Sequence, residues 1–200
     1  MALRRQRRGK PPCPLALEAA LAEKAAMTVL IRPAHEEDLA AITAIYADAV
    51  INGTASFELE PPDLAEMKSR RAALIDKGFP YLVAERADHI VGYAYAGPYR
   101  PRPAYAFTVE DSIYVAPDAH RSGAGRALLA KLINTCEEKG FRQMVAVIGD
   151  SLSAASIGLH QHMGFAHVGT VRNVGFKKGR WLDQVIMQKS LGAGATTPPV

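Results

Sequence analysis

"PDAHRSGAGRALLAKLI", residues 117–133, is the stretch of this 200-residue chain that decides its fold. Gly123 and Gly125 stand directly before a leucine-rich helical pattern, although helix interiors disfavour glycine. One interpretation is a tight turn at the start of a helix. The other is an anion site, because the first N–H groups of a helix lack internal partners and glycine lets phosphate oxygens approach the backbone. Arg121 and Arg126 would add positive charge to such a site.

The segments around this loop alternate between strand-like and helix-like hydrophobic patterns. Strands are expected at residues 29–32, 81–86, 90–96, 106–115, 143–149, 165–176 and 181–189, with a short extended piece at 54–57, and helices at 36–52, 64–77, 124–139 and 154–163. This order favours the α/β class, with one mixed sheet that carries helices on its faces.

The composition indicates a cytoplasmic globular protein. Hydrophobic residues make up 48% of the chain, enough for a substantial core, and no run of about 18 apolar residues is present, so no membrane span is expected. Two cysteines, Cys13 and Cys136, cannot build a disulfide framework, which favours a reducing compartment. Cys136 continues the apolar stripe of the helix at 124–139, and we expect it in the core.

The net charge of +4 belongs entirely to residues 1–26, which hold six basic and two acidic side chains. The remaining 174 residues are balanced, with 18 of each sign. We therefore expect residues 1–26 to be a disordered extension, residues 27–191 to be the functional domain, and residues 192–200 to be a flexible tail. A lone basic arm is weak support for nucleic-acid binding, and we expect no nucleic-acid partner.

The block "DSIYVAPDAHRSGAGRALLAKLINTCEEKGF" resembles the acetyl-coenzyme A motif [QR]-x-x-G-x-[GA] of the GNAT N-acetyltransferase superfamily. His120 stands at the first motif position, where the family usually has Gln or Arg. The resemblance implies a mostly antiparallel mixed sheet, flanked by helices and splayed at the strands that bind acetyl-CoA. It also implies that residues 113–115 pair with the pantetheine arm and that residues 121–126 hold the pyrophosphate. The implied coenzyme-binding residues are Ile113, Tyr114, Val115, His120, Arg121, Ser122, Gly123, Ala124, Gly125, Arg126, Ser153 and Ser156.

A second block, "AVIGDSLSAASIGLHQHMGF", resembles the family pattern N-x-x-S-x-x-L-[YH]-x-x-x-G-F, with Ser153 in the place of the usual Asn. Together with "TASFELEP", "YAYAGPYRPRPAYAFTVEDSIYV" and "VGFKKGRWLD", it resembles the phosphinothricin and methionine sulfoximine acetyltransferase branch over about residues 30–191. The resemblance implies a homodimer. It also implies acetyl transfer from acetyl-CoA to the α-amino group of a small amino acid by direct attack.

Two residues are candidates for proton transfer. Glu110, in mid-strand beside the motif, is the candidate base, and the resembled branch assigns this task to its glutamate; alternatively it points to solvent. His160 is the candidate acid, because an imidazole near pKa 6.5 can protonate a thiolate whose acid is near pKa 8.5. The branch sometimes assigns this histidine as base or amine-binding group, and a packed helix histidine is the plain alternative. His162 lies about 200° around the helix, and a metal site is not expected.

An amino acid with an anionic side group requires cations and an aromatic wall. The loop after Gly97 supplies candidates, although a merely solvated basic loop is the alternative. The candidate substrate-binding residues are Phe57, Tyr99, Arg100, Arg102 and Tyr105, of which Phe57 is implied by the resemblance. Lys177, Lys178 and Arg180 are expected to decorate the turn between the last two strands.

Three alternatives remain at this point. The acceptor can be another amine, including a protein N-terminus. The chain can be a non-catalytic acetyl-CoA-binding module, in which case changes at Glu110 and His160 would leave kinetics unaltered. The arginine-rich leader can bind nucleic acid, which predicts steeply salt-dependent binding that is lost with residues 1–26.

The start of the functional domain can be tested by truncation. A chain that begins at Met27 is expected to be folded and fully active, because the periodic pattern begins with "MTVLIRP". Circular dichroism and the rate of acetyl transfer, compared with those of the full chain, check this. An inactive or unfolded truncated chain contradicts the domain boundary.

Overall fold

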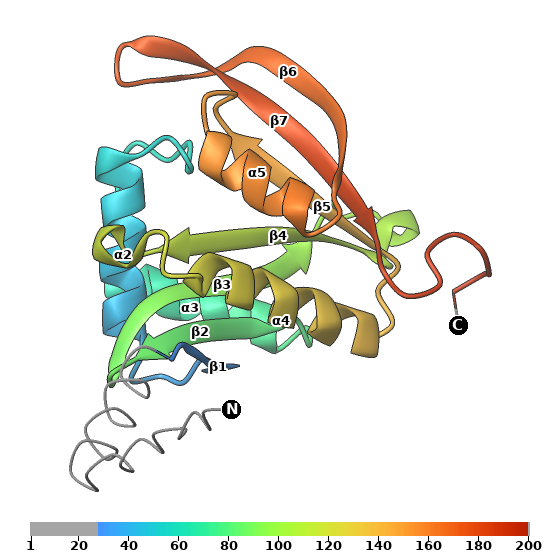
Figure 1. The fold of residues 1–200 in the computed structure, drawn as a ribbon, viewed down its shortest axis with the longest axis horizontal. Helices are drawn as coiled ribbons and strands as arrows, with labels where there is room; N and C mark the ends of the chain where they lie inside the picture. Colours follow the sequence, from blue (N-terminus) through green and yellow to red (C-terminus); the bar gives the residue numbers. More distant parts are fainter. Residues whose placement is uncertain (1–27, 200) are drawn as a thin grey trace, which may run out of the picture.

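A seven-stranded sheet runs through the molecule in the order β1-β2-β3-β4-β5-β7-β6 (Figure 1). The structure is a computed structural model, and it describes residues 28–199. The strands are β1 (Leu30–Pro33), β2 (Tyr81–Arg86), β3 (His89–Pro98), β4 (Thr108–Val115), β5 (Gln143–Gly149), β6 (Ala166–Lys177) and β7 (Arg180–Ser190). The helices are α2 (Leu39–Asn52), α3 (Leu64–Ile75), α4 (Ala124–Glu138) and α5 (Ala154–His162), with short 3₁₀ turns at Pro103–Tyr105 and Pro117–Ala119.

The sheet is mixed, as the hydrophobic pattern predicts, and mostly antiparallel, as the resemblance implies. Only β4 and β5 are parallel neighbours, and they pair over just four residues of each strand, from Thr108↔Gln143 to Asp111↔Ala146. Beyond these pairs β4 continues to Val115 and β5 continues to Gly149 without a shared register. The sheet is therefore splayed between its fourth and fifth strands.

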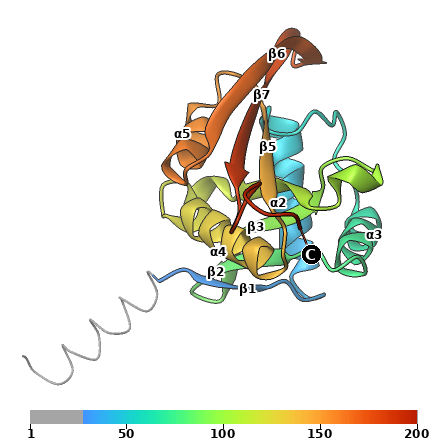
Figure 2. The ribbon, with the colours of Figure 1, turned by 90° about the vertical axis from the view of Figure 1, so that its right-hand side faces the viewer.

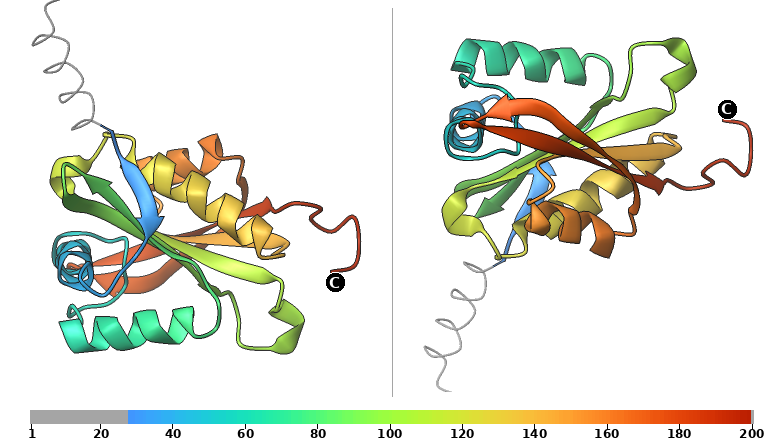
Figure 3. Two further views of the ribbon diagram at one scale, coloured as in Figure 1. Left: turned by 90° about the horizontal axis from the view of Figure 1, so that it is seen from below. Right: turned by 90° about the horizontal axis from the view of Figure 1, so that it is seen from above.

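Helices cover both faces of the sheet, α2 and α3 on one side and α4 and α5 on the other (Figures 2 and 3). The core under α4 holds the predicted apolar stripe, including Cys136, whose side chain is fully buried. The core under α2 and α3 is built around tyrosines. Tyr93 stacks on Tyr114 with ring centroids 5.2 Å apart, and Tyr46 of α2 meets Tyr114 edge-on at 5.0 Å.

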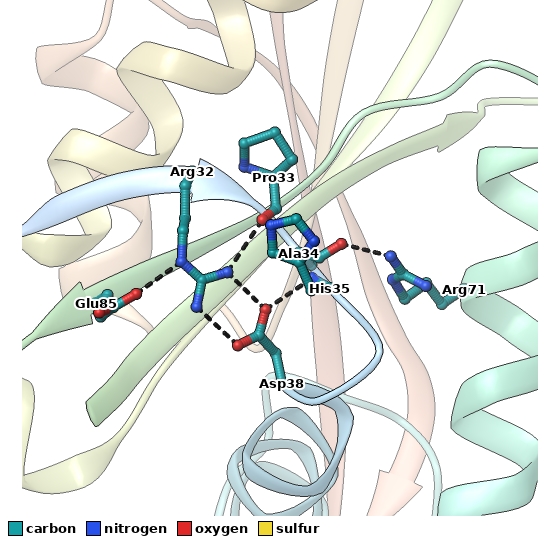
Figure 4. Close-up of polar contacts among 7 residues, drawn as sticks. All are labelled: Arg32, Pro33, Ala34, His35, Asp38, Arg71 and Glu85. Atoms are coloured by element: carbon teal, nitrogen blue, oxygen red, sulfur yellow. Dashed lines mark hydrogen bonds and ion pairs between the residues drawn. The ribbon is translucent and has the colours of Figure 1, made fainter. Parts of the chain in front are cut away.

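An ionic cluster fixes the connection from β1 to α2 (Figure 4). The Arg32 guanidinium donates to both oxygens of Asp38 at 2.7 and 2.8 Å, and its Nε donates to Glu85 of β2 at 2.6 Å. Asp38 also accepts a hydrogen bond from the backbone N–H of His35 at 2.7 Å. Arg71 of α3 donates to the carbonyl of Ala34 in the same connection. One arginine thus joins two strands to the start of a helix.

Residues 54–57, expected as a short extended piece, form bends outside the sheet; they cross the open end of β5, and the carbonyl oxygen of Thr54 lies only 2.5 Å from the position a Cβ would take at Gly149. One expectation about the chain was wrong. Lys177 does not decorate a turn: it is buried, and its Nζ donates to the carbonyl of Ser56 at 2.7 Å. Burial also lowers the pKa of this lysine, so a charge that looked solvated instead ties β6 to the segment before α3. Lys178 is exposed, as expected.

The predicted extension 1–26 lies outside the described residues, and the domain limits stay a prediction. Within residues 28–199, no helix has the length and apolar character that a membrane crossing requires. After β7 the chain turns back, where Gly192 donates from its backbone N–H to Glu137 at 3.2 Å.

Arg32→Met should destabilise the fold by roughly 2 kcal/mol, because it leaves the buried Asp38 carboxylate without its partner; the loss is moderated by the 26% exposure of the Arg32 side chain. The hydrogen bond from Arg32 lowers the pKa of Asp38. The ion pair therefore stabilises the fold fully above the pKa of Asp38 in the unfolded chain, about 3.9, and this contribution is lost as the pH falls below that value toward the lower pKa of the folded state. Urea unfolding of both proteins should give a difference that shrinks on acidification.

Arg172→Met, at an exposed position of β6, is the matched control and should change the free energy of unfolding by no more than about 0.5 kcal/mol. Equal losses in the two variants would show that the Arg32 cluster adds no specific stabilisation.

Candidate active site

A cleft of about 920 Å³ opens where β4 and β5 separate. Its walls are the outer halves of both strands, the loop before α4, the first turn of α4, helix α5, and the end of α2 with the residues that follow it. This volume lies at the upper end of the range of about 300–1,000 Å³ that ligand pockets occupy. The cleft therefore has room for an elongated ligand.

The sides of the cleft include free strand edges. Residues 112–115 of β4 and 147–149 of β5 line it, and neither segment has a ladder partner on the side that faces the other. Backbone N–H and C=O groups in such a place require partners from water or a ligand. An extended ligand that carries amide groups can pair with them as an added strand would.

The glycine loop places the N-terminus of α4 in the wall of this cleft. Gly123 caps the helix with φ +88°, a left-handed conformation that favours glycine, and Arg121 before it has φ +62°. Gly125 lies in the first turn, where N–H groups have no carbonyl four residues earlier to bond. Free N–H groups, the helix dipole and two arginines together make this end suited to an anion. The spatial arrangement thus favours the anion site over a plain turn.

The predicted coenzyme-binding residues gather in one place. All of them line the cleft except Ser122, whose hydroxyl instead lies 3.4 Å from the backbone N–H of Ala124. His120, the residue that departs from the family motif, holds its Nε2 3.1 Å from the carbonyl oxygen of Val115. Its ring therefore fastens the loop to the last residue of β4 rather than standing free.

His160 also lines the cleft, on α5, and it is paired with a residue that the sequence analysis did not single out. Its Nε2 is 3.0 Å from Oδ2 of Asp111 on β4, and its Nδ1 is 2.8 Å from the carbonyl oxygen of Ser156. Both side chains of the pair are buried and both residues line the cleft. Burial lowers the pKa of His160, but the hydrogen bond and the charge of Asp111 outweigh it, so the net shift is upward.

Glu110 occupies the other face of β4. Strand alternation directs Asp111 toward α4 and α5, and it directs Glu110 toward the tyrosine core under α2 and α3. Glu110 is half-buried and does not line the cleft itself. Burial, and then the charge of Asp111, raise the pKa of Glu110, while Arg100 opposes this shift. The carboxyl group stands one residue before the point where β4 and β5 part.

The predicted substrate-binding residues form two groups outside the cleft lining. In the loop between β3 and β4, Arg100 lies 4.6 Å over the ring of Tyr99, which meets Tyr105 edge-on at 5.8 Å. Arg102 is exposed in the same loop. The influence of Arg100 on Glu110 connects this group to the site.

Phe57 belongs to the second group and packs over glycines of two strands. A Cβ at Gly175 of β6 would lie 2.5 Å from its ring, and one at Gly149 of β5 would lie 3.0 Å from it. Gly149 lines the cleft, as do Thr54 and Ala55 just before Phe57. This ring therefore closes over the end of β5 beside the cleft.

Sequence reasoning missed the contribution of α2 and the role of Asp111. The end of α2 and the residues after it line the cleft, at Ile45, Asp48, Ala49, Asn52, Gly53, Thr54 and Ala55. Nothing in the helical pattern separates these positions from an ordinary core face. Asp111 did carry a signal, because two adjacent acids on a strand must point to opposite faces and one of them must then be buried. Within residues 28–199, no three His, Cys, Asp or Glu side chains are grouped as a metal site requires.

Comparison with known proteins agrees with this geometry. Residues 31–186 match the model of the acetyltransferase (GNAT) domain family. A phosphinothricin N-acetyltransferase from Alcaligenes faecalis is 52% identical over 189 residues, which cover 94% of this chain and 96% of the relative. An L-methionine sulfoximine/L-methionine sulfone acetyltransferase from Pseudomonas paraeruginosa is 43% identical over 173 residues, 86% of this chain and 100% of the relative.

A solved structure extends the comparison to three dimensions. The GNAT superfamily phosphinothricin acetyltransferase from Sinorhizobium meliloti, crystallised in complex with AcCoA, is 46% identical and superposes with a TM-score of 0.84. The match covers 86% of this chain and 94% of that one. Fold, cleft and sequence agree, and the chain belongs to the GNAT acetyltransferase family.

Proposed function

We propose that this acetyltransferase moves the acetyl group of acetyl-CoA directly to the α-amino group of a small amino acid or analogue. The candidate acceptors are phosphinothricin, methionine sulfoximine and methionine sulfone, which are the substrates named for its relatives. The observation that carries the proposal is one cleft lined by both the N-terminus of α4 and His160. Its walls combine a helix terminus suited to an anion, free strand edges and a proton-bearing group.

Acetyl-CoA fits the character of these walls. The loop from Arg121 to Arg126 suits the pyrophosphate, because it presents helix N–H groups and two cations. The edge of β4 at residues 113–115 suits the amides of the pantetheine arm. Ser153 and Ser156 line the cleft at the start of α5, and His160 is one turn further along. The thioester would then lie near His160, where the strands part.

The chemistry requires three proton transfers. The acceptor must lose a proton from its ammonium group before its nitrogen can attack the thioester carbonyl, the attacking nitrogen must lose a second proton as the amide forms, and the departing thiolate must gain one. Glu110 is suited to take the first proton, directly or through water, because burial raises its pKa toward the working range of a base. His160 is suited to supply the proton that the thiolate gains, because its pKa is raised above the ordinary value of a histidine. The two groups approach the gap from opposite faces of β4.

The acceptor would lie on the side of Phe57 and the loop between β3 and β4. Arg100 and Arg102 are suited to its anionic groups, and Tyr99, Tyr105 and Phe57 to its carbon chain. The proposal includes a cytoplasmic location, which the scarcity of cysteine supports, and a homodimer, which the resemblance implies.

An acceptor panel tests the acceptor class. Release of free thiol from acetyl-CoA should be catalysed with at least one of phosphinothricin, methionine sulfoximine and methionine sulfone. Because these acceptors are nearly isosteric, their kcat/KM values should lie within about 200-fold of one another. Peptides with free N-termini serve as the comparison. Turnover with peptides and with no amino acid analogue would contradict the proposal and leave another amine as the acceptor.

Glu110→Gln should lower kcat by about 10²- to 10⁴-fold, because it removes the base without changing the size of the side chain. The KM for acetyl-CoA should change little, since Glu110 does not line the cleft. The upward pKa shift of Glu110 predicts that kcat of the unmodified enzyme rises with pH through a value above the ordinary range of a glutamate. Glu138→Gln, at an exposed position on α4, is the matched control and should retain full activity. A fully active Glu110→Gln enzyme would exclude this residue as the base.

A further inference from the structure

The pair formed by Asp111 and His160 is withdrawn from water. The side chain of Asp111 is 2% exposed and that of His160 is 5% exposed, and the two residues are 49 positions apart in the chain. Oδ1 of Asp111 is buried and has no hydrogen-bond partner among residues 28–199. A buried carboxylate with one bonded oxygen is costly, so it depends strongly on the one partner it has.

The contacts of His160 determine how many protons the pair carries. A backbone carbonyl only accepts hydrogen bonds, so the 2.8 Å contact with Ser156 places a proton on Nδ1. A bare Nε2 facing a carboxylate oxygen at 3.0 Å would set lone pair against lone pair. One further proton must therefore lie between Nε2 and Oδ2. Whether it stays on the ring or on the carboxyl, the pair is neutral overall and holds a proton it can give up.

The groups around the Asp111–His160 pair bring no further charge against it that would remove this proton. The Phe165 ring meets the imidazole edge-on at 5.0 Å, and the Cys136 thiol of α4 lies within electrostatic reach of Asp111. Burial, and then Asp111, raise the pKa of Cys136 to about 12, so this thiol stays neutral. Glu110, the next charged group along β4, faces the other side of the sheet.

We propose that Asp111 is a positioning residue, which holds a proton on Nε2 of His160 and so fixes His160 as the acid of the reaction rather than its base. The inference rests on the proposed function. With Nδ1 bonded to the carbonyl of Ser156 and Nε2 engaged with the proton it shares with Asp111, the ring has no free lone pair to accept the proton of the acceptor's ammonium group. It can donate from Nε2 to the leaving thiolate sulfur, and the pair then regains a proton from water. The base must be another group, for which Glu110 is available.

The charge state of His160 can be measured in the resting protein, independently of any acceptor. NMR of ring-labelled histidine should show His160 still carrying both ring protons, or sharing one with Asp111, at neutral pH. Its resonance is identified by its loss in His160→Gln. In Asp111→Asn the ring should titrate at lower pH by about one unit or more, because burial remains and the opposing charge is gone. A singly protonated, freely titrating His160 in the unmodified protein at neutral pH would overturn the proposal.

Kinetics separates positioning from mere structural support. Asp111→Asn should lower kcat at least about tenfold, leave the KM for acetyl-CoA within about twofold, and move the alkaline limb of the kcat–pH profile to lower pH. Asp88→Asn is the matched control, because it makes the same substitution in the exposed turn between β2 and β3, where φ +61° suits asparagine. Its kcat and its kcat–pH profile should match those of the unmodified enzyme. A fall in kcat with an unmoved alkaline limb, or an unchanged profile, would overturn the proposal.

The two experiments also separate this inference from the proposed function. If Asp111→Asn fails to fold, the titration of His160 in the unmodified protein still decides. If no amino acid analogue is acetylated, the acceptor class is wrong, while the position of the proton on His160 is still read by NMR.

Discussion

The early end of the β4–β5 ladder is the constraint on which the rest of the molecule depends. The two strands share only four residue pairs, yet each remains paired on its far side to its full length, β4 with β3 as far as Val115 and β5 with β7 as far as Gly149. The walls of the gap are therefore paired from outside while their inner edges stay open. A ligand can pair with edges that the fold already exposes, which reduces the entropy cost of binding.

Strand alternation then divides the chemistry between two faces. Adjacent residues of β4, Glu110 and Asp111, point into different cores, and each takes its properties from the core it enters. Glu110 faces the tyrosines, where burial favours its protonated form and makes it a stronger base than a solvated glutamate. Asp111 faces α5, where it finds an imidazole. In the proposed reaction, two carboxyl groups one residue apart thus serve different proton transfers, while the charge of Asp111 still raises the pKa of Glu110.

Much of this arrangement was predictable because it follows from local patterns. The strands Tyr81–Arg86 and Gln143–Gly149 fall where the hydrophobic patterns predicted them, and the family resemblance is confirmed by the GNAT match. The glycine loop could be located but not interpreted alone, since a turn and an anion site have the same sequence. The charged residues were harder to predict, because their partners lie far away in the sequence. Lys177 looked like a turn residue because its partner, the carbonyl of Ser56, is 121 residues away. Asp111 was passed over because its histidine belongs to another element.

The glycine under Phe57 in β6 has a consequence for how this enzyme can diversify. Position 175 carries no side chain, and the Phe57 ring occupies the space that a side chain would need. If this ring borders the acceptor, as proposed, a single methyl group at Gly175 would push the ring and reshape the pocket without touching any group that handles protons. The range of acceptors can therefore change through one backbone position while the residues that carry out the reaction stay the same. Paralogues with new substrates would then differ at this position before they differ at any catalytic one.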